Sequence, residues 1–140
     1  MTTEPIQCAA AVCVRSRGGK LEALLVLRGQ APRAGEWSIP GGRMEPGETE
    51  EVAALRELHE ETGVRARLVE KLCTLTPVFD GTPYVLHDWL AVWESGEAVA
   101  GDDAACVRWV TENEARELAL WPPTLEVVLQ ALQRARETLT

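Results

Sequence analysis

Residues 42–64 read GRMEPGETEEVAALRELHEETGV, and they carry most of the structural and chemical information in the chain. Pro46-Gly47 fits the two central positions of a type II turn. Thr49 is a suitable N-cap, and the acidic residues that follow it suit the positive end of a helix dipole. We therefore expect a helix that runs to about Thr62 and ends at Gly63, a typical C′ residue.

The apolar residues of this helix predict which side of it is buried. They recur at helical spacing, so one stripe is expected to face the core. The members of the expected stripe are Val52, Leu55, Leu58 and Thr62.

Three acidic side chains occupy the last two turns of the same helix. Glu57, Glu60 and Glu61 are three and four positions apart, so they project from one side. Carboxylates there repel one another and the negative end of the helix dipole. Arg56 can pair with Glu60 at i,i+4, but one cation does not neutralise three acids. A hard divalent cation such as Mg²⁺ or Mn²⁺ would resolve the repulsion, and a solvated charged face is the alternative.

The surrounding residues favour the metal site. Gly42 is followed after five residues by Glu48, and after seven more by Arg-Glu-Leu-His-Glu-Glu-Thr-Gly-Val. This pattern resembles the complete Nudix box, with every defined position filled, and residues 37–41 before it also resemble that family.

The resemblance implies a role for each residue of the box. Glu57, Glu60 and Glu61 are expected to bind Mg²⁺, or Mn²⁺, together with the backbone carbonyl of Gly41. Glu57 or Glu60 would instead orient or deprotonate the attacking water. Such ions neutralise a diphosphate and lower the pKa of bound water.

Two further roles follow from the resemblance. Glu48 and Arg56 are expected to form an internal pair that fixes the helix. Members of the family often supply an extra ligand or base from the region before the last strand. Asp103 is the first choice for this catalytic role and Asp102 the second, with an ordinary Gly-Asp-Asp turn as the alternative.

Substrate contacts are expected outside the box. Arg28 ends a predicted strand near the site and resembles a phosphate contact, although a surface salt bridge would also explain it. Arg43 and Arg33 are further candidates for phosphate. Tyr84 is a candidate for stacking on a base. Phe79 and Trp121 are others.

The rest of the chain alternates predicted strands with two more helices. Strands are expected at residues 8–15, 21–28, 37–39, 64–75, 84–93 and 106–110, and the second of these also allows a short helix. Helices are expected at residues 111–118 and from Pro122-Pro123 onward, the latter buried along Leu125, Val128, Leu129 and Leu132. The fold class is α/β: an α/β/α sandwich of the Nudix type with a mixed, partly antiparallel sheet, as one domain over residues 1–140.

Composition and charge indicate which binding partners and which cellular compartment to expect. The net charge of −8 disfavours nucleic acid polymers, and we expect neither a signal segment at Met1–Gln7 nor a membrane span, because no apolar run is long enough. Its four cysteines match no metal or redox spacing, so they are expected to be small buried hydrophobes in a reducing compartment, the cytoplasm. Dimers are common among similar proteins, and a homodimer through the outer strands is open.

These observations predict a Nudix pyrophosphohydrolase that cleaves a nucleoside diphosphate linked to another group. ADP-ribose or a similar nucleotide sugar is the first choice of substrate, giving a nucleoside monophosphate and a phosphorylated fragment. A (d)NTP pyrophosphohydrolase that removes damaged or non-standard nucleotides is the nearest alternative. A non-catalytic Nudix-fold binding module is disfavoured because all three acids of the helix are present.

Overall fold

The computed structural model describes residues 4–30, 33–101 and 104–139. The three helices are α1 (Glu50–Thr62), α2 (Glu112–Glu117) and α3 (Pro122–Leu139). The strands are β1 (Ile6–Arg17), β2 (Lys20–Arg28), β3 (Trp37–Ser38), β4 (Gly41–Arg43), β5 (Arg65–Leu75), β6 (Val78–Phe79), β7 (Thr82–Ser95) and β8 (Ala104–Val110).

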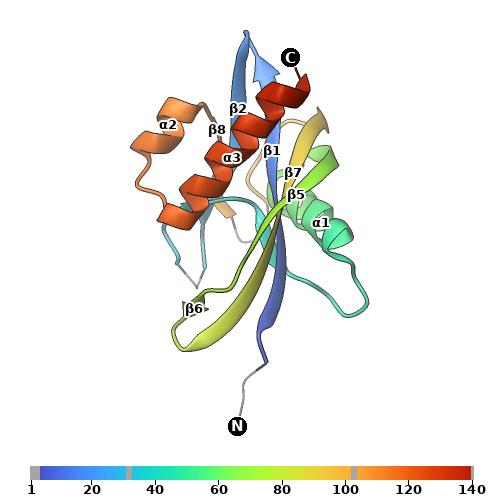
Figure 1. The fold of residues 1–140 in the computed structure, drawn as a ribbon, viewed down its shortest axis with the longest axis vertical. Helices are drawn as coiled ribbons and strands as arrows, with labels where there is room; N and C mark the ends of the chain where they lie inside the picture. The colour runs from blue at the N-terminus through green and yellow to red at the C-terminus, as the bar shows by residue number, and fades with distance from the viewer. Residues whose placement is uncertain (1–3, 31–32, 102–103, 140) are drawn as a thin grey trace.

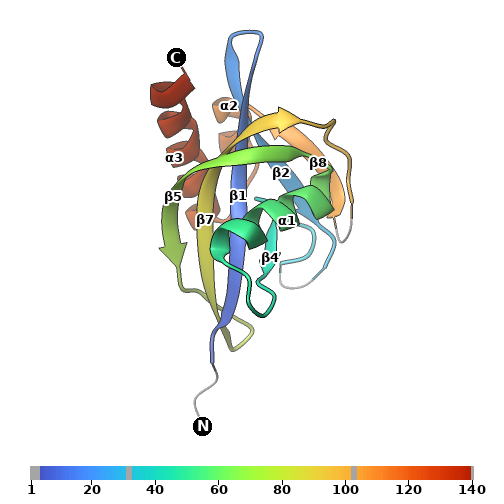
Figure 2. The same ribbon diagram turned by 90° about the vertical axis from the view of Figure 1, so that its right-hand side faces the viewer.

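The strands form one eight-stranded mixed sheet whose central path is β3-β2-β1-β7-β5. β1 and β7 run parallel, whereas β1 with β2, β2 with β8 and β5 with β7 are antiparallel. The segment that also allowed a short helix is thus a strand, β2. The expected α/β/α sandwich with a mixed sheet is confirmed, and Figures 1 and 2 show α1 and α3 on opposite faces of the sheet.

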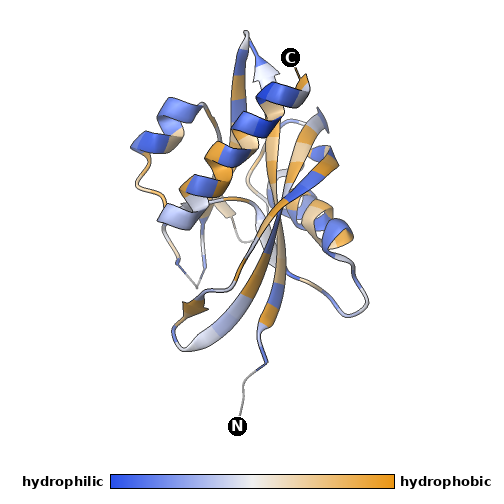
Figure 3. Ribbon diagram, viewed as in Figure 1, coloured by the Kyte–Doolittle hydropathy of each residue, from blue (hydrophilic) through white to orange (hydrophobic). Residues whose placement is uncertain are grey.

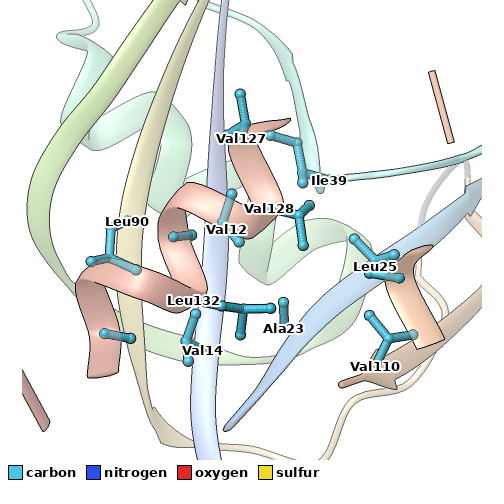
Figure 4. Close-up of a cluster of buried hydrophobic side chains, with 13 residues drawn as sticks. Val12, Val14, Ala23, Leu25, Ile39, Leu90, Val110, Val127, Val128 and Leu132 are labelled. Carbon is cyan, nitrogen blue, oxygen red and sulfur yellow. The ribbon is translucent and has the colours of Figure 1, made fainter. Parts of the chain in front are cut away.

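Alternate residues of β1 divide the core between these two faces. Val12 and Val14 pack toward α3, together with Leu90 of β7 and with Val128 and Leu132 of α3 (Figure 4). The intervening residues of β1 pack toward α1, against a second buried cluster that includes Ala53, Ala54 and Leu58. This alternation follows from the two-residue period of a strand.

Helix α3 is amphipathic, as its sequence predicts. Its hydrophilic residues face outward in Figure 3, while Val128 and Leu132 are fully buried. Leu125 is only partly buried against the same core, and Leu129 is also partly exposed. The deeper contacts are made by the smaller Val127, Ala131 and Ala135, because small side chains let the helix approach the sheet closely.

Two expectations were wrong in detail. Val52 is 56% exposed, because α1 turns Ala53 and Ala54 toward the sheet in its place. Cys106 is exposed, unlike Cys13, which is fully buried, although all four cysteines are free as expected.

Strand β4 was not expected, since Pro40-Gly41-Gly42 looked like a break. It pairs antiparallel with residues 8–10 of β1. Within the described residues, no helix is long and apolar enough to cross a membrane.

Candidate active site

Helix α1 begins and ends where its sequence predicts. The Thr49 side chain accepts a hydrogen bond from the amide of Val52 at 3.2 Å, which is the N-cap contact. Gly63 adopts the left-handed conformation (φ 75°), and its N–H donates to the carbonyl of His59. Such a residue favours glycine because a Cβ is strained there. These caps fix the length of α1 and therefore the position of its last two turns.

Two of the three acids in the last two turns of α1 meet the backbone of β4. The amide of Gly41 donates to Glu61 Oε2 at 2.7 Å, and Glu61 is only 8% exposed. Gly42 lies against the other acid: a Cβ there would come within 2.7 Å of both carboxylate oxygens of Glu57. The glycine pair thus brings α1 and β4 together closely enough for both carboxylates to sit on the strand.

Arg56 forms ion pairs with acids of α1 and of the loop that precedes it. Its Nε lies 2.6 Å from Glu48 Oε2, and its Nη1 lies 2.9 Å from Glu57 and 3.1 Å from Glu60. Its Nη2 also donates to the carbonyl of Arg43 at 3.1 Å. The expected pairs with Glu48 and Glu60 are confirmed, and the guanidinium holds α1 to the loop that precedes it.

The acids experience different electrostatic environments. Hydrogen bonds from Arg56 and from the amide of Glu45 lower the pKa of Glu48 to about 2. Burial raises the pKa of Glu57, with Glu60 and Glu48 adding to the effect and Arg56 opposing it. The side chain of Glu60 is 43% exposed. The site therefore grades from the nearly buried Glu61 through Glu57 to the solvent-facing Glu60.

The donor set fits a hard divalent cation, although the carboxylates do not form a preassembled cage. Among residues 4–30, 33–101 and 104–139, no three His, Cys, Asp or Glu side chains are arranged to hold a metal ion. Instead, Glu57 and Glu60 share the Arg56 guanidinium. The donors at this position are carboxylate oxygens beside a glycine backbone, which is the chemistry Mg²⁺ prefers, and the missing Cβ of Gly42 leaves space at Glu57.

The loop after β7 closes over the end of α1. The amides of Val99 and Gly101 donate to the carbonyls of Thr62 and Glu61 at 2.9 and 2.8 Å. Carbonyls at a helix C-terminus need such partners. Asp102 and Asp103 follow Gly101 directly but lie outside the described residues, so the catalytic role expected for Asp103 stays a prediction.

A pocket of about 210 Å³ opens beside the glycine pair. All of the residues predicted to contact substrate line it: Arg28, Arg33, Arg43, Phe79, Tyr84 and Trp121. Gly41 and Gly42 line it as well, so the pocket adjoins the carboxylates of α1. The structure thus brings together groups that lie far apart in the sequence.

Three aromatic rings and a cation gather in the pocket lining. The ring centroid of Phe79 lies 5.5 Å from that of Tyr84 and 5.3 Å from that of Trp121. The guanidinium of Arg33 lies 4.9 Å from the centroid of Trp121 and 5.4 Å from that of Phe79, and it pairs with Glu36 at 2.6 Å. All of the aromatic side chains considered for base stacking therefore share one site.

The sequence analysis did not identify the buried acid of the pocket. Asp88, on β7, is 3% exposed and lines the pocket. An acid inside the apolar run of residues 84–93 was the available signal, because a charged residue on the buried face of a strand needs a reason.

Comparisons with known proteins agree with this geometry. A family model described as NUDIX domain matches residues 5–132. The CTP pyrophosphohydrolase of Escherichia coli (strain K12) is 35% identical over 135 residues, which cover 94% of this chain and 96% of that protein. The 8-oxo-(d)GTP phosphatase of Mycolicibacterium smegmatis is 36% identical over 110 residues, covering 78% of this chain but only 34% of that protein. The chain therefore spans about a third of the length of this second relative.

The fold has a close match among solved structures. The NUDIX domain of Shewanella oneidensis NrtR, complexed with ADP ribose, superposes with a TM-score of 0.82 at 26% sequence identity. The match covers 99% of this chain and 91% of that one.

Proposed function

The chain belongs to the Nudix family of hydrolases, and we propose that it is an Mg²⁺-dependent pyrophosphohydrolase of nucleoside triphosphates. The observation that carries the proposal is the contact of Glu57 and Glu61 with the Gly42 and Gly41 backbone beside a pocket lined by arginines and aromatic rings. Carboxylates for a cation, cations for phosphate and rings for a base are the three parts that such a substrate requires.

Four groups of this chain would hold the cation: the Gly41 carbonyl, Glu57, Glu60 and Glu61. When bound, Mg²⁺ (or Mn²⁺) neutralises phosphate oxygens and lowers the pKa of a coordinated water. Nudix hydrolases as a group use divalent metal ions, which agrees with this donor set.

The chain itself supplies the proton acceptor. Glu57 is our first candidate because it is the more buried of the two and lies against the β4 backbone. Glu60 is more exposed and suits metal binding or orientation of that water. Asp103 is retained as a further candidate for this step.

Phosphate and base would occupy different parts of the pocket. Arg28 and Arg43 suit the phosphates, since a guanidinium fork matches phosphate oxygens. Tyr84, with Phe79 and Trp121, suits the base, because the ring faces stack on any nucleobase.

Two relatives support the proposed substrate class. The E. coli protein, named for CTP, matches nearly the whole of both chains, and the mycobacterial relative is named for 8-oxo-(d)GTP. We therefore propose nucleoside triphosphates ahead of ADP-ribose, which was the first choice from sequence. ADP-ribose is kept as the second candidate because of the Shewanella complex at 26% identity.

A substrate panel tests the proposal. Nucleoside triphosphates, deoxynucleoside triphosphates and ADP-ribose are compared at one Mg²⁺ concentration, with release of pyrophosphate or of monophosphates measured. Hydrolysis of a triphosphate to the monophosphate and pyrophosphate is expected. Rapid hydrolysis of ADP-ribose beside inert triphosphates would reverse the two candidates.

A pair of variants tests the site. Glu60→Gln is expected to lower kcat by about two to three orders of magnitude, the typical loss when a group that stabilises transition-state charge is removed. Glu51→Gln is the matched control, because Glu51 is an exposed acid in the first turn of the same helix. Undiminished turnover in Glu60→Gln would contradict the mechanism.

A further inference from the structure

Asp88 is a buried acid whose position in the pocket has no explanation in the hydrolytic machinery. It pairs with Ala10 of the parallel strand β1, and Ala10 in turn pairs with Gly41 of β4. Its side chain is on the same face of the sheet as Leu90, which packs toward α3, whereas Glu57 approaches from the α1 side. Asp88 is therefore on the pocket side of the sheet, apart from the acids of α1.

The protein donates few hydrogen bonds to the Asp88 carboxyl group. Across the described part of the chain, the only hydrogen bond to it comes from Cys73 Sγ, 3.8 Å from Oδ2. A thiol is a weak donor, and a buried carboxylate needs several strong ones. Burial accordingly raises the pKa of Asp88 to about 7, opposed by the Cys73 contact and the charge of Lys71. The group is short of hydrogen-bond donors.

A ligand bound in the pocket could donate hydrogen bonds to Asp88. The aromatic cluster of Phe79, Tyr84 and Trp121 lines the same pocket as Asp88, and so do Gly41 and Gly42. A base stacked on the rings, with its phosphates directed toward the glycine pair, would present its edge to the interior of the pocket. Since the described residues offer Asp88 only the Cys73 thiol, a ligand in the pocket can supply the missing donors.

We propose that Asp88 determines base specificity by accepting two adjacent N–H groups from the nucleobase, which selects guanine-type bases. This inference rests on the proposed function, since it requires a substrate that carries a nucleobase.

Hydrogen-bond chemistry singles out this class. A carboxylate has two parallel acceptor oxygens and no donor. Guanine offers a ring N1–H beside an exocyclic 2-amino group, so both oxygens are satisfied at once. Cytosine and adenine present one donor beside an acceptor nitrogen, and uracil and hypoxanthine present one donor beside a carbonyl. Two donors also replace the solvation that burial removes, which favours the ionised form of Asp88.

The protonated group would behave differently. A neutral carboxyl has one donor and one acceptor, which match the N1–H and O6 of guanine and of hypoxanthine equally well. Guanine and hypoxanthine differ only in the 2-amino group. A preference for guanine over hypoxanthine therefore indicates ionised Asp88, and equal binding indicates protonated Asp88.

Binding of GMP and IMP to the full chain tests the proposal without hydrolysis. We expect the wild-type protein to bind GMP about 10- to 100-fold more tightly than IMP by calorimetry, the usual range for a bidentate contact to a base. Asp88→Asn replaces one acceptor with a donor and should bring the ratio close to one. Asp80→Asn makes the same change at an exposed turn residue outside the pocket and should leave the ratio unchanged.

Each result decides the proposal. Equal binding of GMP and IMP by the wild-type protein overturns it, as does a preference for GMP that survives in Asp88→Asn. If circular dichroism shows that Asp88→Asn is unfolded, Asp88→Ser serves as the second variant, and the same two criteria apply.

Kinetics separate this inference from the proposed function. Equal kcat/KM for GTP and ITP would overturn base recognition and leave pyrophosphohydrolysis intact. Selective binding of GMP by a protein that hydrolyses no nucleotide would support base recognition and overturn the proposed function.

Discussion

The Arg56 guanidinium and the Glu48 carboxylate face each other through two hydrogen bonds, Nε to Oε2 at 2.6 Å and Nη2 to Oε1 at 2.9 Å. Such a forked contact fixes orientation as well as distance. Because the same guanidinium contacts Glu57 and Glu60, Glu48 indirectly positions the acids proposed to bind metal.

Glu48→Gln is expected to weaken activity and to lower stability at neutral pH. Misplacing Arg56 should lower kcat by about 10- to 100-fold, the range typical of a small displacement at a reacting centre. The pKa of Glu48 falls from 4.5 to about 2 in the folded chain, so its stabilising contribution is present above pH 4.5 and is lost between pH 4.5 and 2. Melting temperatures of the wild type and variant, measured from pH 7 to 2, should converge at the acid end. A constant difference across that range would contradict the assignment.

Substitution of Gly41 and of Gly42 by alanine should have different effects on activity and stability. In Gly42→Ala the new Cβ meets the end of the flexible Glu57 side chain, so we expect loss of at least about tenfold in kcat with a nearly unchanged melting temperature. In Gly41→Ala it meets the Ala9 carbonyl and the backbone of Ala10, which cannot move without shifting β1. That variant should lose stability first. Thermal melts and initial rates for both proteins check the contrast.

Divalent metal should stabilise the folded chain through the α1 carboxylates. A ligand that binds only the folded state raises stability by about 1.4 kcal/mol at tenfold excess over its Kd. We expect Mg²⁺ to raise the melting temperature of the wild type and EDTA to reverse the effect and abolish activity. Glu57→Gln should show a much smaller shift, whereas Glu51→Gln should match the wild type. Equal shifts in all three proteins would place metal binding elsewhere.

Trp121→Leu should affect substrate binding more than chemistry. It removes the edge contact with Phe79 and the ring beneath Arg33. Loss of one stacking ring costs about 1–3 kcal/mol, so KM should rise by roughly 5- to 150-fold while kcat changes little. Trp93→Leu is the control, because Trp93 is exposed near the far end of β7. A fall in kcat at constant KM would assign Trp121 another role.

Asp88→Asn should stabilise the empty protein at neutral pH. The pKa of Asp88 rises from 3.8 to about 7 on folding, so the unfolded chain loses its proton first and wild-type stability falls as the pH rises from 3.8 to 7. At pH 8 the variant should be more stable by on the order of 2–4 kcal/mol, and below pH 4 the difference should vanish. Urea denaturation at several pH values measures it. A variant less stable than the wild type at pH 8 would show that Asp88 is satisfied by the protein.

Local sequence signals predicted much of the fold and the site. Thr49 and Gly63 cap α1 as expected, because capping depends on neighbouring residues. β4 was missed because a Pro-Gly-Gly stretch looks like a break, and only the close approach of Ala9 and Ala10 explains why glycine suits a strand there.

The features that the sequence did not predict depend on long-range packing. Val52 has the right helical spacing for burial, but the direction in which α1 turns depends on the sheet. Asp88 lies 47 positions after Gly41 in the chain, and only the pairing of β1 with both β4 and β7 brings these strands together. Its place in the pocket follows from topology alone.

The glycine pair of β4 also separates two tasks in space. A Cβ on Gly41 would point toward Ala10 and the pocket side of the sheet, and one on Gly42 would point toward Glu57 and α1. Bond cleavage and base recognition are thus assigned to opposite surfaces of the same short strand. If Asp88 selects the base, substitutions around it can change nucleotide specificity without altering the carboxylates of α1. Related proteins could then evolve different substrate preferences while keeping the same hydrolytic reaction.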